Sequence, residues 1–435
     1  MPVLSVAAAP AAPAAPAAPA APAAPAAAAP GQQKGLAISL VIPLPAVSPS
    51  QTNDEVFALY DAAPGLSALP VAEDDRPIGL INRNIFMDSF ARPFHREVYG
   101  RKSCIAFMDK QPLIVDGDMS IQDLSFRVVD AGGKTLNDGF VITAGGRYLG
   151  MGTGQDLVRA IAGMQAEKSR IVMESIDYAS VIQRSFLRPS REALRSLLPD
   201  HLLLWEPRDL VGGDYFYCRR FDDGFFLTLF DCTGHGVPGA FMTLIMASFI
   251  DSALREENRQ DPAAVMTEVN QRVKSALGQI DHRHKAAASN DEAEHRSDDG
   301  MDAAFCWVAP AERQMIYAGA HSPLILLRPG QEIELFEGDR AGVGYASTPM
   351  DQTWQNHSFP LPPGTAAYLT TDGLIDQPGG PKRIAFGKKR LCALLAEHRH
   401  ATTLAPLRGV ILQALEDYQG KDARRDDVGL IGFRL

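Results

Sequence analysis

Four aspartate-containing motifs, each beside an apolar run or a glycine, constrain the C-terminal half of this 435-residue chain more than any other feature. They read VGGDYF around Asp214, LFDCTGHG around Asp231, LTTDGLID around Asp372, and RRDDVGLI around Asp426 and Asp427. Any one of them alone is typical of an ordinary turn, because aspartate beside glycine is common there. Together they predict a fold that brings several strand ends to one place.

Carboxylates that converge in this way repel one another unless cations lie between them. Sites built from oxygen ligands suit Mg²⁺ or Mn²⁺. We therefore expect Asp231 to bridge two such ions, and we expect the glycines of its turn to leave room for a bulky anionic substrate.

From residue 198 onward, short apolar runs are mixed with helical patterns, and hairpins predominate over strict βαβ alternation. This favours the α+β fold class over a doubly wound sheet. The expected strands lie at 201–207, 225–231, 302–309, 314–320, 323–328, 366–373 and 428–435. The expected helices lie at 238–257, 262–279, 388–398 and 404–418.

The N-terminal part begins with a low-complexity tail, residues 1–34, in which APAAP units recur. Frequent proline prevents a regular helix, so we expect a disordered tail. A second polar stretch, residues 281–300, contains His282, His284 and His295. Its few apolar residues favour a solvated loop over a metal-binding tract.

An internal repeat follows the tail. The segment that starts at Leu69 aligns without a gap with the segment that starts at Phe140, so that Arg76 falls on Arg147 and Gly79 on Gly150. Each copy predicts a strand, a polar turn, a strand and a helix, which suggests a pseudo-twofold module.

This module, residues 35–164, resembles a tandem CBS domain pair. Its second copy carries Gly150, Thr153 and Asp156 in a spacing similar to the motif that contacts ribose and phosphate in nucleotide-binding CBS repeats. The first copy has Asn82 and Ile85 at the matching positions and departs from that motif. The resemblance implies a nucleotide effector at Thr153 and Asp156, and a structural or dimerising role is the alternative.

Residues 165–197 predict a helical connector. Val172, Ile176, Ala179, Ile182 and Phe186 recur at three- and four-residue steps, and Pro189 is expected to end or kink the helix. Such a helix favours a coiled-coil homodimer, or it lies against its own domain.

The four aspartate motifs, in their order, resemble the SpoIIE-type branch of the metal-dependent PPM serine/threonine protein phosphatases over residues 198–435. The resemblance implies a β-sandwich of two antiparallel sheets with helices on both outer faces, and a dinuclear Mn²⁺ or Mg²⁺ centre. It implies that Asp231 bridges both ions, that Asp214 and the carbonyl of Cys232 contribute ligands, and that Asp372 and Asp426 complete the second ion's shell. Asp427 is the alternative to Asp426.

Asp231 and Asp372 are accordingly the expected catalytic residues, and Asp302 is a candidate ligand for a weaker third ion. His235 is a candidate general acid, with a turn-shaping role as the alternative. The family often places the turn around His321 near the site. A thiol mechanism at Cys232 is disfavoured, because no C-x₅-R phosphate loop follows it.

The function that the resemblance implies is hydrolysis of a phosphoserine on a small STAS-type anti-sigma antagonist or a similar partner-switching protein. A non-catalytic module that sequesters such a partner is the competing class. A metal-dependent nucleotide hydrolase is a third reading. Retention of every metal aspartate favours catalysis.

Composition excludes some classes of function and location. A net charge of −10 disfavours non-specific nucleic-acid binding, which relies on clustered Lys and Arg. The five cysteines are scattered without a C-x-x-C motif, which favours a reducing compartment. No apolar run reaches the ~18–20 residues of a membrane span, and the N-terminus lacks a basic signal region. We therefore expect a cytoplasmic protein.

Overall fold

The computed structural model describes residues 35–279 and 298–435. The predicted tail and most of the predicted histidine-containing loop lie outside these residues. Contacts within the chain define two compact units, the first ending at Arg170 and the second comprising Ile171–Leu435. Each is described by itself.

The first unit contains two similar strand–turn–strand–helix segments, as the internal repeat predicts. β1 (Ala68–Glu73) and β2 (Arg76–Asn82) form an antiparallel hairpin that leads into α2 (Arg83–Phe90), whereas β4 (Phe140–Ala144) and β5 (Arg147–Gly152) lead into α6. Each hairpin also has a parallel partner, because residues 114–116 pair with β4 and Val47 forms a bridge with Val71 of β1. The remaining elements are η1 (Ala37–Leu40), α1 (Asn53–Ala62), α3 (His95–Tyr99), η2 (Cys104–Phe107), β3 (Ile114–Asp116), α4 (Ile121–Asp130) and α5 (Gly133–Asp138). The resemblance to a CBS pair stays a prediction.

The connector helix begins earlier than expected, and Pro189 does not end it. α6 (Gly154–Leu197) is one helix of 44 residues that begins directly after β5 and continues through Pro189. In its last part Gln183, Leu187 and Leu194 are buried at helical spacing, whereas Phe186 is exposed. This part of α6 therefore packs against the second unit, which was one of the two alternatives.

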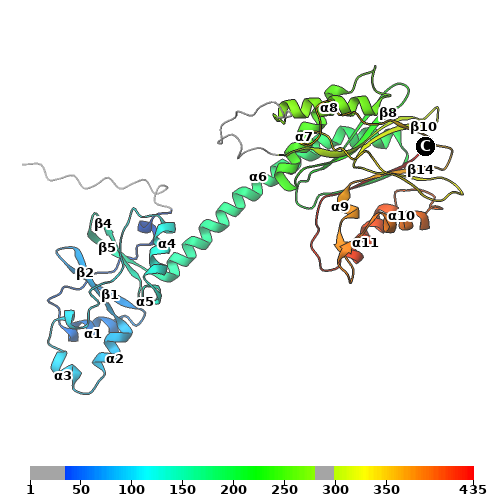
Figure 1. Cartoon of the computed structure of the whole chain (residues 1–435). Coiled ribbons are helices and arrows are strands. Elements are labelled where there is room, and N and C mark those ends of the chain that lie inside the picture. Colours follow the sequence, from blue (N-terminus) through cyan, green and yellow to red (C-terminus); the bar gives the residue numbers. More distant parts are fainter. Residues whose placement is uncertain (1–34, 280–297) are drawn as a thin grey trace, which may run out of the picture. The chain divides into compact units, whose positions relative to one another are not determined.

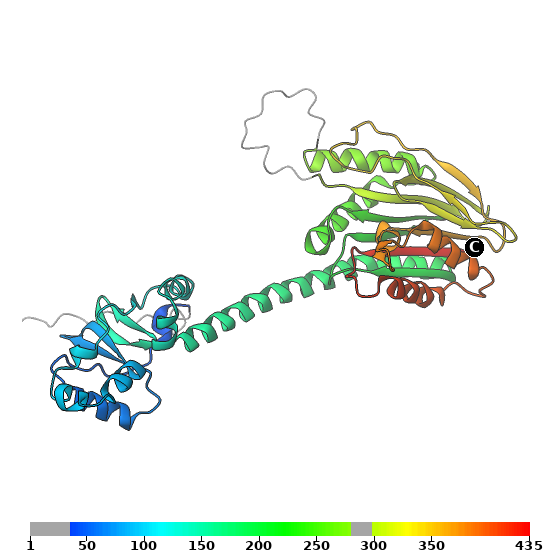
Figure 2. The same ribbon diagram turned by 60° about the horizontal axis from the view of Figure 1, so that its bottom comes forward.

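The second unit is built on two five-stranded antiparallel sheets (Figures 1 and 2). The first has the order β13-β10-β9-β8-β7, and the second β12-β11-β14-β17-β6. The first sheet consists of β7 (Asp214–Arg220), β8 (Phe225–Cys232), β9 (Met301–Ala309), β10 (Gln314–Ala320) and β13 (His357–Pro360). The second consists of β6 (Asp200–Glu206), β11 (Leu324–Leu327), β12 (Glu334–Phe336), β14 (Ala366–Thr370) and β17 (Val428–Arg434).

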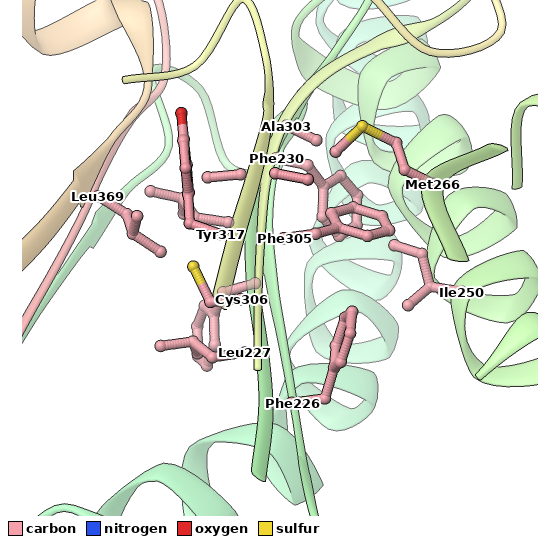
Figure 3. Close-up of a cluster of buried hydrophobic side chains, with 14 of the residues drawn as sticks. Phe226, Leu227, Phe230, Ile250, Met266, Ala303, Phe305, Cys306, Tyr317 and Leu369 are labelled. Carbon is pink, nitrogen blue, oxygen red and sulfur yellow. The ribbon is translucent and has the colours of Figure 1, made fainter. Parts of the chain in front are cut away.

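Alternating side chains of the first sheet serve two hydrophobic layers (Figure 3). Leu227 and Cys306 lie on the face towards the second sheet, near Leu369 of β14. Phe226 and Phe305 lie on the opposite face, towards two covering helices. These helices are α7 (Gly236–Ala253) and α8 (Pro262–Ala276). This is the period-two alternation of a strand that is buried on both faces.

The outer face of the second sheet is covered by α10 (Lys388–Glu397) and α11 (Leu407–Gln419). Tyr368 of the sheet belongs to the same buried cluster as Leu391 of α10 and Leu415 of α11. The short elements α9 (Asp372–Ile375), β15 (Pro378–Gly379) and β16 (Ile384–Ala385) complete the unit. The resulting order of layers is helices, sheet, sheet, helices, so the predicted α+β class is confirmed.

α7 is the only helix among the described residues that is long and apolar enough to cross a membrane. In the structure its Met246 and Ile250 are fully buried in the core of the second unit. Packing against a sheet accounts for its apolar composition.

Candidate metal centre

Three neighbouring strands of the first sheet place aspartates side by side. Asp214 at the start of β7 pairs directly with Asp231 near the end of β8, and Asp231 pairs with Asp302 of β9. Residues directly opposite one another in antiparallel strands point to the same face of the sheet. Three of the predicted acidic residues therefore form one row at one end of the sandwich.

The second sheet supplies the other acidic residues. Asp372 begins α9 directly after β14, and Asp426 precedes β17, which pairs with β14. Gly373 allows these segments to meet, because a Cβ there would lie 1.8 Å from the carbonyl oxygen of Asp427. The hydroxyl of Thr371, the residue before Asp372, donates a hydrogen bond to Asp214, so the end of β14 in the second sheet meets the row of aspartates in the first.

Asp214 is the most informative member of the cluster. Its Oδ2 accepts a 2.7 Å hydrogen bond from the hydroxyl of Thr371, whereas its Oδ1 is buried without a hydrogen-bond partner. Burial is the main cause that raises the pKa of Asp214 well above its usual range, and the neighbouring carboxylates add to this effect. The hydrogen bond from Thr371 lowers the pKa but does not cancel the rise. A buried polar atom normally has a partner, so the unpaired oxygen fits a ligand for a cation.

The carboxyl groups of Asp231 and Asp372 influence each other's pKa. Burial is the main cause that raises the pKa of each, and for Asp231 the charges of Asp214 and Asp372 add to it. Among residues 35–279 and 298–435, no three His, Cys, Asp or Glu side chains already converge on one ion position.

The carboxylates of Asp427 and Asp426 make different contacts. Its Oδ1 accepts the backbone N–H of Arg208 at 2.6 Å, and its Oδ2 accepts the N–H of Gly213 at 2.6 Å. Both carboxylate oxygens thus hold the loop that leads into Asp214. Asp426 is half-exposed, and its Oδ1 accepts the N–H of Asp427.

The glycine beside Asp214 serves close packing. A Cβ on Gly213 would lie 2.4 Å from the carbonyl oxygen of Gly234 and 2.9 Å from that of Cys232. A Cβ on Gly239 would lie 2.2 Å from the same oxygen of Gly234. The expectation that glycines keep this turn open was incomplete, because Gly213 and Gly239 let the two loops touch backbone to backbone. Gly234 itself has φ +85° with open space around it.

The Cys232 thiol is unsuited to nucleophilic attack. It is buried, and burial together with the charges of Asp231 and Asp214 raises its pKa well above the usual value. A protonated, enclosed thiol is inert. The backbone N–H of Cys232 donates to the carbonyl of Gly213 at 3.0 Å.

Two histidines lie beside acidic residues at this end of the unit. His321 Nδ1 is 3.0 Å from Oδ1 of Asp302, and this contact raises the pKa of His321 although burial alone would lower it. His235 Nδ1 is 3.2 Å from Oδ2 of Asp209, on an exposed turn. Sequence reasoning missed both partnerships, because each joins residues from separate segments.

The predicted nucleotide-binding pair in the first unit forms a helix cap. The N–H of Asp156 donates to the Thr153 hydroxyl at 3.1 Å, and that hydroxyl donates to Oδ2 of Asp156 at 2.6 Å. Arg159 also pairs with Asp156. The aligned Asn82 caps α2 by accepting the N–H of Ile85 at 2.9 Å. The two copies are thus more alike than the sequence suggested, and a ligand would have to compete with these bonds.

Comparison with known proteins agrees with this architecture. A sequence model of the family described as Stage II sporulation protein E (SpoIIE) matches residues 222–435. The solved structure of the SiaA-PP2C domain of Pseudomonas aeruginosa is similar, with 36% sequence identity and a TM-score of 0.53. The match covers 62% of this chain and 99% of that one. No curated protein sequence matches the chain.

More distant structures also match. The PP2C phosphatase domain of SpoIIE from Bacillus subtilis, with a fragment of its regulatory domain, has 13% identity and a TM-score of 0.41. That match covers 54% of this chain and 62% of the other. The structure of the RsbU and RsbW domains of a Mycobacterium tuberculosis protein has 18% identity and a TM-score of 0.41. That match covers 54% of this chain and 59% of the other. The C-terminal half of this chain therefore belongs to the SpoIIE-type PP2C serine phosphatase family.

Proposed function

We propose that this chain is a metal-dependent protein phosphatase that hydrolyses a phosphoserine on a STAS-type regulator protein, using two Mn²⁺ or Mg²⁺ ions. The observation that carries the proposal is the buried, unpaired Oδ1 of Asp214 beside Asp231. An oxygen-only cluster of this kind suits these hard cations.

Asp231 would hold both ions, because it lies between Asp214 and Asp302 in the row of strands. Asp214 and the Cys232 carbonyl would complete one shell, and Asp372 and Asp426 the other. Asp302 remains a candidate for a third ion, although it would have to share its carboxylate with His321. When bound, two such ions polarise a phosphoryl group and lower the pKa of a bound water towards ~7.

The chain's own residues would position this chemistry. Thr371 orients Asp214, and Asp427 fixes the loop at Gly213. The buried, protonated Cys232 offers no covalent route, so attack by water on the phosphoryl group is the consistent mechanism. His235 is held by Asp209 on the exposed turn, which supports a turn-shaping role.

The substrate class rests on the resemblance of the four aspartate motifs to SpoIIE-type phosphatases. A module that only sequesters its partner would not need an unpaired buried carboxylate oxygen, and the cluster keeps every acidic residue of the pattern. The resemblance of residues 35–164 to a tandem CBS pair supports a regulatory role for the first unit, with a nucleotide as candidate effector at Thr153 and Asp156. The α6 helix supports a homodimer as candidate assembly. The five cysteines are all free, which supports the cytoplasm as the location.

The test is hydrolysis of p-nitrophenyl phosphate by the full chain with Mn²⁺, with Mg²⁺ and with EDTA. We expect turnover with the metals and none with EDTA. The Asp214→Asn variant should be inactive, whereas the matched control Asp223→Asn, which removes a surface ion pair with Arg259, should keep the wild-type rate. Equal rates with Mn²⁺ and with EDTA would exclude the proposed mechanism.

A further inference from the structure

The second unit, residues 171–435 and called the catalytic unit from here on, contains a positively charged cavity outside the aspartate cluster. It has a volume of about 410 Å³ and lies between the end of α6, strand β6 and the start of α11. Its lining consists of Arg191, Arg195, Pro199, His201, Leu202, Leu203, Trp205, Ala405 and Arg408.

Three arginines from two helices meet at this cavity, and only one of them is neutralised. Arg408 of α11 forms an ion pair with Glu206. Nε of Arg191 is buried without a hydrogen-bond partner. Arg195 has no acidic partner within 4 Å among the described residues. The cavity therefore carries an excess of positive charge in a chain whose net charge is −10.

Such an arrangement favours an anionic ligand. Burial lowers the pKa of Arg191, and the charges of Arg195, Arg184 and Arg408 lower it further, so these cations repel one another. Arg191 is half-buried and Arg195 is exposed, so the charge of Arg195 remains accessible to an anion. Guanidinium groups without a carboxylate match the fork geometry of a phosphate.

The remaining walls are apolar and aromatic. Leu203 and Trp205 of β6 are half-buried and line the cavity beside Pro199. The indole Nε1 of Trp205 donates a 2.9 Å hydrogen bond to the backbone carbonyl of Asp214. One wall of the cavity is thus joined to the strand that begins the aspartate cluster.

We propose that this cavity is a binding site for a phosphomonoester, whose phosphate contacts Arg191 and Arg195 and whose organic body lies against Leu203 and Trp205. The phosphomonoester comes from a small metabolite such as a mononucleotide, or from a phosphorylated side chain of a protein. Neither source requires the aspartate cluster to be catalytic, so the site stands apart from the proposed phosphatase activity.

The experiment is titration of the full chain in EDTA, followed by tryptophan fluorescence and calorimetry. Without metal ions the aspartate cluster repels anions, and a change in Trp205 fluorescence separates binding at the arginine cavity from binding at the candidate nucleotide site of the first unit. Trp205 is the suitable reporter, because Trp307 and Trp354 are only 2% and 5% exposed. The probes are inorganic phosphate, AMP and a short peptide that contains phosphoserine.

Saturable binding in the micromolar to low-millimolar range is expected. A preference for AMP of about tenfold or more over phosphate would assign a small-molecule source, and the same preference for the peptide would assign a protein source. Arg195→Gln should weaken binding by about tenfold or more, because charge-assisted hydrogen bonds to the phosphate are lost. Arg195 is exposed, so this variant is expected to fold.

The control is Arg188→Gln. Arg188 is on the same helix but is ion-paired with Glu192 and does not line the cavity. The affinity of the Arg188→Gln variant for each probe should stay within about twofold of wild type. The substitution removes the same charge as Arg195→Gln, but Arg188 makes no contact with the phosphate. The proposal is overturned if none of the three probes binds below about 10 mM. It is also overturned if Arg195→Gln and Arg191→Gln both bind as wild type does.

Discussion

The hydroxyl of Thr371, which follows strand β14 of the second sheet, donates a 2.7 Å hydrogen bond to Oδ2 of Asp214 in the first sheet. The same hydroxyl oxygen accepts the N–H of Gly429 at 2.8 Å. One threonine therefore fixes the orientation of the buried aspartate and joins the two sheets at the site.

Thr371→Val should weaken metal binding by about 10- to 100-fold, as loss of a hydrogen bond to a ligand commonly does. The substitution keeps the shape of the side chain but removes the donor to Asp214. The measurement is the Mn²⁺ concentration that half-activates hydrolysis. Thr371→Ser, which retains the hydroxyl, should restore it, and an unchanged half-activation in the valine variant would show that Thr371 does not orient Asp214.

Asp426 and Asp427 should behave differently when each is changed to asparagine. Asp427→Asn should lower stability by about 1–3 kcal/mol, because an amide nitrogen would face a backbone N–H that the carboxylate now satisfies. Asp426→Asn should leave the unfolding midpoint nearly unchanged and abolish Mn²⁺-dependent turnover. The measurements are denaturant unfolding and Mn²⁺-dependent activity of both variants. If Asp427→Asn were stable but inactive and Asp426→Asn unstable but active, Asp427 would be the metal ligand instead of Asp426.

Metal-free stability should respond to pH through the buried aspartates. The folded-state pKa values of Asp214 and Asp231 are raised above the unfolded value of ~3.9, so the folded protein binds more protons than the unfolded one. Their contribution is therefore favourable below that pH and is lost as pH rises. In EDTA, Asp214→Asn should melt above wild type at pH 7, and the difference should shrink towards pH 4.5. A difference independent of pH would contradict this account.

The homodimer prediction should be tested at other residues of α6 than those that its apolar periodicity indicated. Ile176 and Ile182 are half-buried, so charging them would disturb the catalytic unit as well as any dimer. Tyr178 and Val181 are 69% and 58% exposed. Val181→Glu should dissociate a coiled-coil dimer of the full chain without lowering its melting temperature. Light scattering that finds wild type already monomeric would remove the dimer.

The secondary structure of the catalytic unit was largely predictable where periodicity is strong. Strand β8 and helix α8 were expected almost at their observed positions, because β8 is a short continuous apolar run and α8 follows the helical period of 3.6 residues. Strand β7 was not predicted. Its sequence DYFYCRR alternates poorly, and it is an edge strand whose character depends on pairing with β8.

The acidic residues were predictable from their motifs, but the residues that hold them were not. The contacts of Thr371 with Asp214 and of His321 with Asp302 join separate strands, so no local spacing reveals them. The roles of Asp426 and Asp427 likewise depend on the backbone N–H groups of Arg208 and Gly213, far away in the sequence. The arginine cavity was missed for the same reason, because α6 and α11 supply its charges from distant positions.

The central claim is that the aspartate cluster is a dinuclear metal centre that removes phosphate from phosphoserine. The most direct measurement is release of inorganic phosphate from a phosphoserine peptide by wild type and by Asp231→Asn, each with saturating Mn²⁺. The account predicts steady turnover by wild type and a loss of several orders of magnitude in the variant, whose fold should persist because a repelling charge is removed. Wild-type turnover by a folded Asp231→Asn variant would contradict it.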